Sequence, residues 1–378
     1  MAGPTEAAGP DIAGSDRVNI GFIAIIVAVA TIGGFMFGYD SGVINGTQDG
    51  LERAFNLSAL GTGFNVGAIL LGCAVGAFIA GRLSDLIGRR TVMLIAAVMF
   101  IISALWAGAA DSSMHFIIAR FIGGLGVGAA SVLAPAYISE VTPASIRGRL
   151  SSVQQIMIII GLTGAFVANY ALAALAGGST ELFWMDIPAW RWMFWLQVIP
   201  AGIYLLALLM IPESPRFLVV KGREAQALAV LSRLFGPEAG ARKVAEIRAS
   251  LASDHKPKLA DLLDPVTRNI RPIVWAGLIL AVFQQLVGIN IVFYYGAVLW
   301  QSVGFSENDA LLINIGSGAL SIVACLAAID GKLTEMPKLA IHWAKPATAS
   351  AEPRIWLGNI SPSMTHITGP QLKLKKMT

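Results

Sequence analysis

The sequence predicts an all-α polytopic membrane protein, and two observations support this fold class. The composition is strongly apolar, with 56% hydrophobic residues, 13% charged residues and a mean hydropathy of +0.69, far from the average for soluble domains. The apolar residues also occur in long runs. Because a hydrocarbon layer of ~30 Å needs roughly 20 apolar residues per helix, each run can cross a bilayer as one helix.

About eight such runs occur along the chain. They lie near residues 18–44, 59–81, 91–110, 114–139, 152–177, 191–211, 272–299 and 307–329. Residues 1–17 carry Asp11 and Asp16 where a secretory signal would carry basic residues, so we expect no cleaved signal. Cys73 and Cys325 fall inside apolar runs, which favours packing roles over a disulfide framework.

The basic residues of the loops predict the orientation of the chain. Many lie in the stretch 212–271, and others flank two short loops: Arg82, Arg89, Arg90, Arg147 and Arg149. The opposite loops offer only Arg53 and Arg191. We therefore expect a plasma (inner) membrane protein with its N-terminus, these loops and the linker in the cytoplasm. The net charge of +4 mostly reflects this bias, so we expect the lipid bilayer and no nucleic acid as a partner.

The chain divides into six spans, a long polar linker and two further spans. We expect a cytoplasmic tail over 1–17, a six-helix bundle over 18–211, a linker over 212–271, two helices of a second bundle over 272–330 and a polar tail over 331–378. Within the linker, Glu224 to Leu234 and Ala239 to Leu251 have apolar residues at helical spacing. This pattern predicts short amphipathic helices against the membrane face.

A charged run, Gly81 to Arg90, separates the second and third spans, where we expect a short loop. Its pattern G-x-x-x-D-x-x-G-R-R resembles the loop between helices 2 and 3 of the major facilitator superfamily. The resemblance implies the major facilitator fold, with a complete first bundle and a partial second one. Many transporters join two such halves through a linker.

Further motifs resemble the sugar porters of that superfamily over roughly residues 18–330. In chain order they are Phe37-Gly38-Tyr39-Asp40, Arg120-Phe121-Ile122-Gly123-Gly124, Glu140 with Arg147-Gly148-Arg149, Trp190-Arg191-Trp192-Met193, Pro212-Glu213-Ser214-Pro215-Arg216-Phe217-Leu218, and Gln284 to Asn290 with Tyr294-Tyr295. Glycines 123, 124, 126 and 128 lie within a span, so they favour close helix packing over a dinucleotide loop. The resemblance implies a secondary transporter that moves a sugar by alternating access.

Asp40 and Arg120 are the candidate proton-coupling residues. Each lies about six or seven residues from the outer end of its span, ~10 Å deep at 1.5 Å per residue. Opposite charges at equal depth are expected to pair, because an isolated charge there is costly. Burial disfavours a charged carboxylate and a nearby guanidinium favours it, so Asp40 could switch its protonation. A structural ion pair is the alternative. In the family, an acid here accompanies proton symport.

Polar amides in the spans are the candidate sugar ligands, because sugar hydroxyls need both donors and acceptors. Gln284 and Gln285 lie about 12 residues into the seventh span, ~18 Å deep. We expect Gly288 to distort the helix and turn them, with Asn290, toward a cavity. Bonding between neighbouring helices is the alternative. By resemblance, Gln155 is another sugar ligand, and Phe37 and Tyr294 line the site.

The charged residues near the cytoplasmic loops are the candidate gate, with state-dependent ion pairs. They are Asp85, Arg89, Arg90, Glu140, Arg149, Glu213 and Arg216. We expect Asp85 to lie near the positive end of the third span and to interact with arginines of neighbouring loops. The assignment as a gate rests on the resemblance, because solvated pairs contribute little individually.

The chain departs from the family after Asp330-Gly331-Lys332, where we expect truncation or a shifted reading frame. The family's helix-8 asparagine falls on Gly318 by spacing, and Asn314 or Ser317 could replace it. Three functions follow: a truncated proton-sugar symporter, a transport-inactive membrane protein that only binds or associates, or a porter for a polyol such as inositol. No enzyme, metal or cofactor is expected, because no nucleophile-base pair, metal cluster or phosphate loop is present.

Overall fold

The computed structural model describes residues 19–253, 262–263 and 269–329, excluding the side chains of 144–149, 151, 252–253 and 329. The predicted tails 1–17 and 331–378, part of the predicted linker and Asp330 therefore lie outside the described residues. The chain divides into a unit of Met1–Leu326 and a unit of Ala327–Thr378. The second unit contributes only the end of the last helix, so the account below concerns the first.

Helices make up nearly all of the regular structure in the described ranges. In chain order they are α1 Ile20–Val43, α2 Gln48–Phe55, α3 Ala59–Ile87, α4 Arg89–Ala109, α5 Ser113–Val141, α6 Ala144–Ala176, α7 Ala189–Leu196, α8 Val198–Met210, α9 Pro215–Val220, α10 Glu224–Phe235, α11 Pro237–Ser253, α12 Pro272–Leu286, α13 Ile289–Ser302 and α14 Glu307–Ile329. Short 3₁₀ turns occupy Ile44–Gly46 and Trp184–Asp186.

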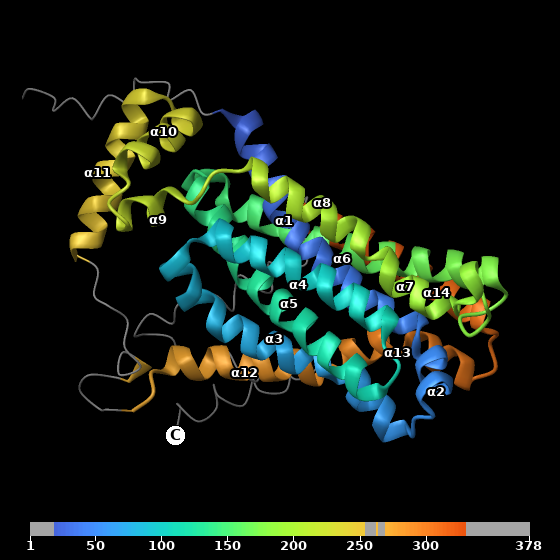
Figure 1. Ribbon diagram of the computed structural model, residues 1–378. Coiled ribbons are helices and arrows are strands. Elements are labelled where there is room, and N and C mark those ends of the chain that lie inside the picture. Colours follow the sequence, from blue (N-terminus) through green and yellow to red (C-terminus); the bar gives the residue numbers. More distant parts are fainter. Residues whose placement is uncertain (1–18, 254–261, 264–268, 330–378) are drawn as a thin grey trace, which may run out of the picture. The chain divides into compact units, whose positions relative to one another are not determined.

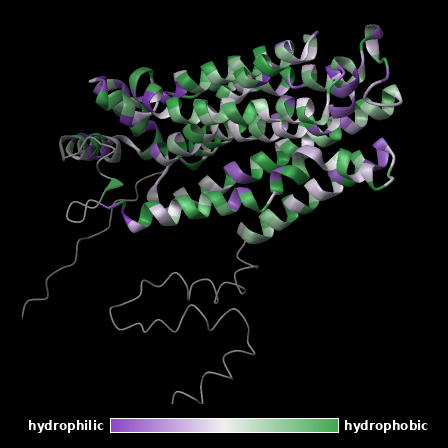
Figure 2. Ribbon diagram, turned by 90° about the horizontal axis from the view of Figure 1, so that it is seen from below, coloured by the Kyte–Doolittle hydropathy of each residue, from purple (hydrophilic) through white to green (hydrophobic). Residues whose placement is uncertain are grey.

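Eight helical segments in the described residues are long and apolar enough to cross a membrane, which confirms the predicted number. Two of them are broken: α7 and α8 form one span, and α12 and α13 form another. Large apolar side chains face outward, including Phe78 with 89% of its surface exposed and Met210 with 81%. Hydrophobic residues follow the long helices in Figure 2. Such a surface suits lipid and would be a liability in water.

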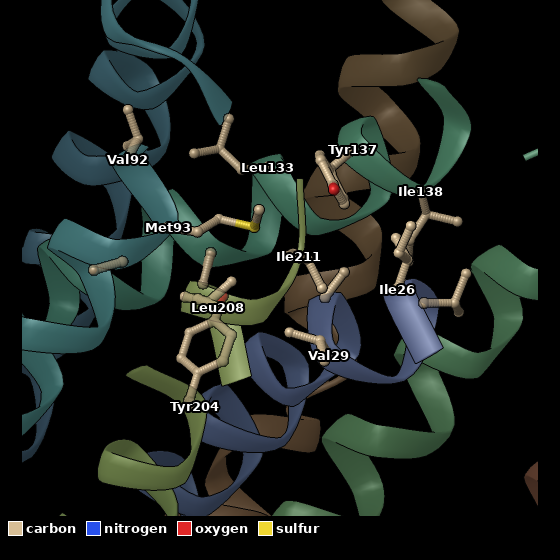
Figure 3. Packing of buried hydrophobic residues seen from close by; sticks show 14 of the residues in the cluster. Ile26, Val29, Val92, Met93, Leu133, Tyr137, Ile138, Tyr204, Leu208 and Ile211 are labelled. Carbon is tan, nitrogen blue, oxygen red and sulfur yellow. The ribbon is translucent and has the colours of Figure 1, made fainter. Parts of the chain in front are cut away.

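The first six spans pack in pairs. α3 packs against α5, α1 against α6, and α4 against both α5 and α8 (Figure 1). Residues from α1, α4, α5 and α8 form a buried apolar cluster that includes Ile26, Met93, Leu133 and Tyr204 (Figure 3). α8 leads into α9, α10 and α11 at what we call the linker end, and the opposite end is called the far end.

Glycines permit the close contact between α3 and α5. A Cβ added at Gly124 would lie 2.2 Å from the carbonyl oxygen of Ile69, and one at Gly128 would lie 2.1 Å from that of Cys73. No larger residue fits without moving a helix backbone. The predicted packing role of these glycines is confirmed, and it is the close approach typical of small residues in membrane helices.

The charged run between α3 and α4 differs from the predicted loop. α3 continues to Ile87 and α4 begins at Arg89, so Gly88 alone lies outside the helices. Its φ of +105° is one that L side chains rarely adopt. The helices extend through the polar run because backbone hydrogen bonding does not need apolar side chains. A boundary predicted from hydropathy alone therefore falls before the real end of the helix.

Two helices predicted for the linker are present, and a third helix was not predicted. α10 and α11 occupy the predicted amphipathic segments, and Leu231, Leu234 and Phe235 join the apolar cluster. The sequence reading did not anticipate α9, which Ser214 caps by accepting from the backbone N–H of Phe217. It also did not anticipate α2 at the far end. α2 has eight residues, too few to register as a span.

The α3–α5 contact can be tested with Gly124→Ala. We expect the variant to be destabilised by roughly 1–3 kcal/mol, as overpacked sites typically are, because its methyl group would meet a backbone carbonyl. Thermal unfolding of the detergent-solubilised protein measures this. Gly67→Ala is the matched control, since nothing lies within 4 Å of an added Cβ there. Equal unfolding temperatures for the two variants would contradict the packing argument.

Candidate functional site

Asp40 lies in the last turn of α1 and is fully buried. Close contact between α1 and α6 holds this part of α1 inside the bundle. A Cβ added at Gly38 would lie 1.8 Å from the carbonyl oxygen of Ile158, so glycine is required there. The sequence therefore places a carboxylate where α1 is most tightly enclosed.

Arg120 of α5 is the partner of Asp40, as predicted. Its Nη1 donates to Asp40 Oδ1 over 2.7 Å, and its Nη2 donates to the Asp40 backbone carbonyl over 3.1 Å. Only 1% of the Arg120 side-chain surface is exposed. The guanidinium also lies 5.6 Å from the centre of the Phe194 ring, within cation–π range. Two helices distant in sequence thus share a desolvated ion pair.

Gln197 is a third member of this site, and the sequence reading missed it. Its Nε2 donates to Asp40 Oδ1 over 2.9 Å, and the residue is fully buried. Gln197 lies between α7 and α8. The available signal was Pro200, which lacks an N–H for the carbonyl three or four residues earlier and breaks the span close to Gln197.

Tyr294 and two asparagines lie next to this site, toward the far end. The Tyr294 side chain is buried, and its backbone carbonyl accepts a hydrogen bond from Gln48 Nε2 over 2.5 Å. Asn314 of α14 donates to Asn45 Oδ1 over 2.8 Å, and Asn45 donates to the Phe293 carbonyl over 2.8 Å. The structure thus places Tyr294 near the pair. Among the described residues, Asn314 is the buried amide of α14, and it lies one turn from Gly318.

The other predicted sugar ligands lie apart from the pair. Gln155 is exposed on α6, whereas Phe37 is partly buried against the apolar cluster. Gln284 and Gln285 are exposed on α12. Asn290 donates to Gln285 Oε1 over 2.8 Å, which joins two of the predicted amides.

Gly288 breaks the seventh span as predicted, but its effect differs from the expectation. Its φ is +78°, and it separates α12 from α13. Both glutamines precede this break and occupy adjacent positions of regular helix, about 100° apart around the axis at 3.6 residues per turn. The break therefore turns Asn290 back toward Gln285 and does not bring Gln284 and Gln285 onto one face.

An ion-pair network occupies the linker end. Arg89 Nη2 lies 2.7 Å from Asp85 Oδ1, and Arg89 Nε lies 3.3 Å from Glu140 Oε1. Ser214 Oγ donates to the other oxygen of Glu140. The side chains of Arg89 and Glu140 are each only 14% exposed. This network therefore connects α4, α5 and the segment before α9 away from most solvent.

Glu213, and not Asp85, meets the positive end of α4. Its Oε1 accepts from the backbone N–H of Arg90 over 3.1 Å, while Asp85 lies in the last turn of α3 and is 67% exposed. The expected contact between Asp85 and the positive end of α4 is wrong, because α3 extends past the predicted loop; Asp85 pairs with Arg89. Arg90 Nε donates to the Leu208 carbonyl over 2.8 Å, which ties α4 to the end of α8.

Arg216 lies near the same network. It lines a cavity of about 270 Å³ together with Glu140, Lys243 and Glu246. The side chain of Arg149 lies outside the described residues. Within the described ranges, no group of three or more His, Cys, Asp or Glu side chains could hold a metal ion.

Comparisons with known proteins identify the family of this chain. A family model described as "Sugar (and other) transporter" matches residues 26–331. The glucose transport protein of Synechocystis is 46% identical over 312 residues, which cover 82% of this chain and 66% of that protein. The D-xylose-proton symporter of Escherichia coli K12 is 37% identical over 339 residues, 83% of this chain and 67% of that protein. The chain thus spans about two thirds of the length of these relatives.

Solved structures give the same result. The xylose transporter XylE from E. coli, in a partially occluded inward-open conformation, superposes with a TM-score of 0.71 at 34% identity, covering 82% of this chain and 73% of that one. XylE bound to 6-bromo-6-deoxy-D-glucose superposes with a TM-score of 0.73 at 36% identity, covering 82% and 69%. The chain has the helical fold of the major facilitator superfamily and belongs to its sugar transporter family.

Proposed function

We propose that this chain serves proton-coupled sugar transport by alternating access. The observation that carries the proposal is the buried Asp40–Arg120 pair, with 2.7 Å between Oδ1 and Nη1. A proton carrier needs a carboxylate that is shielded from bulk water and has a compensating charge nearby. Relatives whose names include proton symport, for D-xylose and for arabinose, support this assignment.

Two polar atoms of the ion pair are available for new interactions. Asp40 Oδ2 and Arg120 Nε have no hydrogen-bond partner among the described residues. A proton arriving on Oδ2 would neutralise the carboxylate and weaken its attraction to Arg120. Because the two residues belong to α1 and α5, protonation would loosen the contact between these helices and bias the bundle toward a different arrangement.

We assign sugar binding to amides of α6, α12 and α13, with aromatic side chains beside them. Three of these amides are exposed: Gln155, Gln284 and Gln285. Asn290 is partly buried. Amides offer the donors and acceptors that sugar hydroxyls require. Phe37 and Tyr294 would supply apolar faces for the sugar ring.

The same site chemistry would accept a polyol, and one relative supports this second candidate. The major myo-inositol transporter of Bacillus subtilis is 36% identical over 313 residues. A cyclic polyol presents hydroxyls much as a pyranose does, so the substrate class includes both. A panel of sugars and myo-inositol would separate them.

We assign the network at the linker end to a gate on the cytoplasmic side of the plasma membrane. Arg89, Glu140, Glu213 and Arg90 join α4, α5 and α8 there, with Asp85 bound to Arg89. Arg216, and Arg149 by resemblance, would belong to it as well. The basic residues of the linker favour the cytoplasmic orientation. Breaking the network would let the linker ends of these helices separate.

Asp40→Asn tests proton coupling. We expect the variant to lose sugar accumulation driven by a pH gradient and to keep sugar exchange, because an amide cannot release a proton. Labelled-sugar uptake by proteoliposomes, with and without the gradient, measures both. Asp111→Asn is the control, since Asp111 is 84% exposed. Accumulation by Asp40→Asn equal to wild type would leave the pair a purely structural role.

Gln285→Ala tests sugar binding. We expect the Kd for the transported sugar to rise about tenfold, which corresponds to the loss of one good hydrogen bond at about 1.4 kcal/mol. Calorimetric titration with a panel of sugars and myo-inositol measures the Kd. Gln226→Ala, on the exposed surface of α10, is expected to bind as wild type does. An unchanged Kd for Gln285→Ala would remove α12 from the site.

Arg89→Gln and Glu140→Gln test the gate. Each is expected to lower the initial uptake rate with little change in sugar affinity. The double variant should lose less than the sum of the two single losses, because both substitutions break the Arg89–Glu140 contact. The matched control is the exposed Glu224–Arg248 pair, in which hydrogen bonding to Glu224 raises the pKa of the Arg248 guanidinium. Its loss is expected to leave uptake rates unchanged. Additive losses from the first pair would contradict the assignment.

A further inference from the structure

The turn between α6 and α7 presents large apolar side chains outward at the far end. Leu182 is 59% exposed, Trp184 64% and Met185 69%. We propose that this turn, residues 181–186, inserts into the interfacial layer of the bilayer at the far end and anchors α7 there. Its ligand is a lipid surface. The inference goes beyond the proposed function, because it depends neither on proton coupling nor on sugar binding.

The turn lies at the end of an exposed apolar stripe on α7 and α8. The members of the stripe recur every three or four residues, which places them on one face of a helix. They are Trp192, Trp195, Ile199, Ile203, Leu206 and Met210. The last four are each more than half exposed, so no described part of the protein covers this face. In a membrane protein such a face meets lipid.

The length of the stripe locates the boundary of the bilayer. Trp192 and Met210 are 18 positions apart within one span, or ~27 Å at 1.5 Å per residue, which is close to the ~30 Å of a hydrocarbon core. Just beyond Met210, Glu213 accepts from the backbone N–H of Arg90 in the charged network of the linker end. That end of the stripe therefore meets water, and Trp192 marks the opposite boundary.

Trp184 packs directly on Trp192 at this boundary. The two rings are stacked, with centroids 5.2 Å apart and an interplanar angle of 23°. Trp192 Nε1 donates to the Trp184 carbonyl over 3.2 Å, and Trp195 Nε1 donates to the Leu105 carbonyl over 3.1 Å. In contrast, no group of the described residues accepts from the indole N–H of Trp184. An indole with an exposed apolar face and an N–H left for headgroups or water is typical of membrane–water interfaces.

The backbone of the turn is strained where it presents these side chains. The Phe183 N–H closes the turn by donating to the Ile187 carbonyl over 3.0 Å. Met185 and Asp186 have φ of +59° and +55°, in the left-handed region that bulky side chains rarely adopt. Moving the exposed Trp184 and Met185 side chains from water into the interfacial layer would offset this strain.

The charges of the turn limit its depth. Glu181 and Asp186 are exposed on either side of the apolar residues, and a carboxylate in hydrocarbon is costly. The interfacial layer accepts both kinds of group, because apolar side chains can enter it while carboxylates stay among headgroups and water. An exposed indole face also suits a sugar ring, but the continuity of the turn with the lipid-facing stripe favours a lipid surface.

The test places an environment-sensitive fluorophore on Met185→Cys in the full chain, with the native cysteines removed by Cys73→Ala and Cys325→Ala. The protein is reconstituted into phosphatidylcholine vesicles, with or without bromine on the acyl chains near the headgroup. We expect brominated lipid to quench emission from position 185 and iodide in the water to quench it weakly. Asn308→Cys is the matched control, because it is exposed among polar residues at the start of α14. Its label should respond to iodide and not to brominated lipid.

A second substitution tests the role of the indole. Trp184→Ser in the labelled protein should make position 185 accessible to iodide, whereas Trp275→Ser, which removes an exposed indole of α12, should leave it shielded. Equal iodide quenching at positions 185 and 308 would overturn the inference. Shielding of position 185 by added sugar and not by lipid would overturn it too, because the turn would then be a sugar platform. If Met185→Cys does not fold, Leu182→Cys reports on the same turn.

Discussion

The ion pair between Asp40 and Arg120 is the constraint on which the rest of the bundle depends. A charge removed from water is costly unless a partner and further hydrogen bonds compensate it. Here the compensation comes from α1, α5 and the break between α7 and α8. These helices must approach closely for the contacts to form. Glycines in the α1–α6 and α3–α5 interfaces allow that approach, so the packing of small residues and the burial of the pair require each other.

The same helices connect the ion pair to the linker end. α5 carries Arg120 near its start and Glu140 near its end, a separation of 20 positions or about 30 Å along a helix. α8 begins beside Gln197 and ends where Arg90 binds the Leu208 carbonyl. Under the proposed function, a loosening of the pair would tilt these helices and so act on the charged network.

Much of the site could be predicted from the sequence, although unevenly. The pairing of Asp40 with Arg120 was predicted correctly because the depth of each residue in its span can be counted along the sequence, and the two depths are equal. The role expected of Asp85 belongs to Glu213, because the length of α3 depends on backbone hydrogen bonding through a polar run. Gly288 was identified as a break, but the direction in which it turns the neighbouring amides depends on which residues precede it in regular helix.

The sequence by itself determined the membrane class, the eight spans, the amphipathic linker helices and the family, because hydropathy, periodicity and motif spacing are written along the chain. Only the tertiary structure decided which polar groups form hydrogen bonds with one another across the bundle. Gln197 lies 157 positions from Asp40, and Glu213 lies 123 from Arg90. Pro200 marks a break near Gln197, but the sequence does not specify the contacts themselves. They arise from how helices are placed around one another and from which buried group still needs a partner.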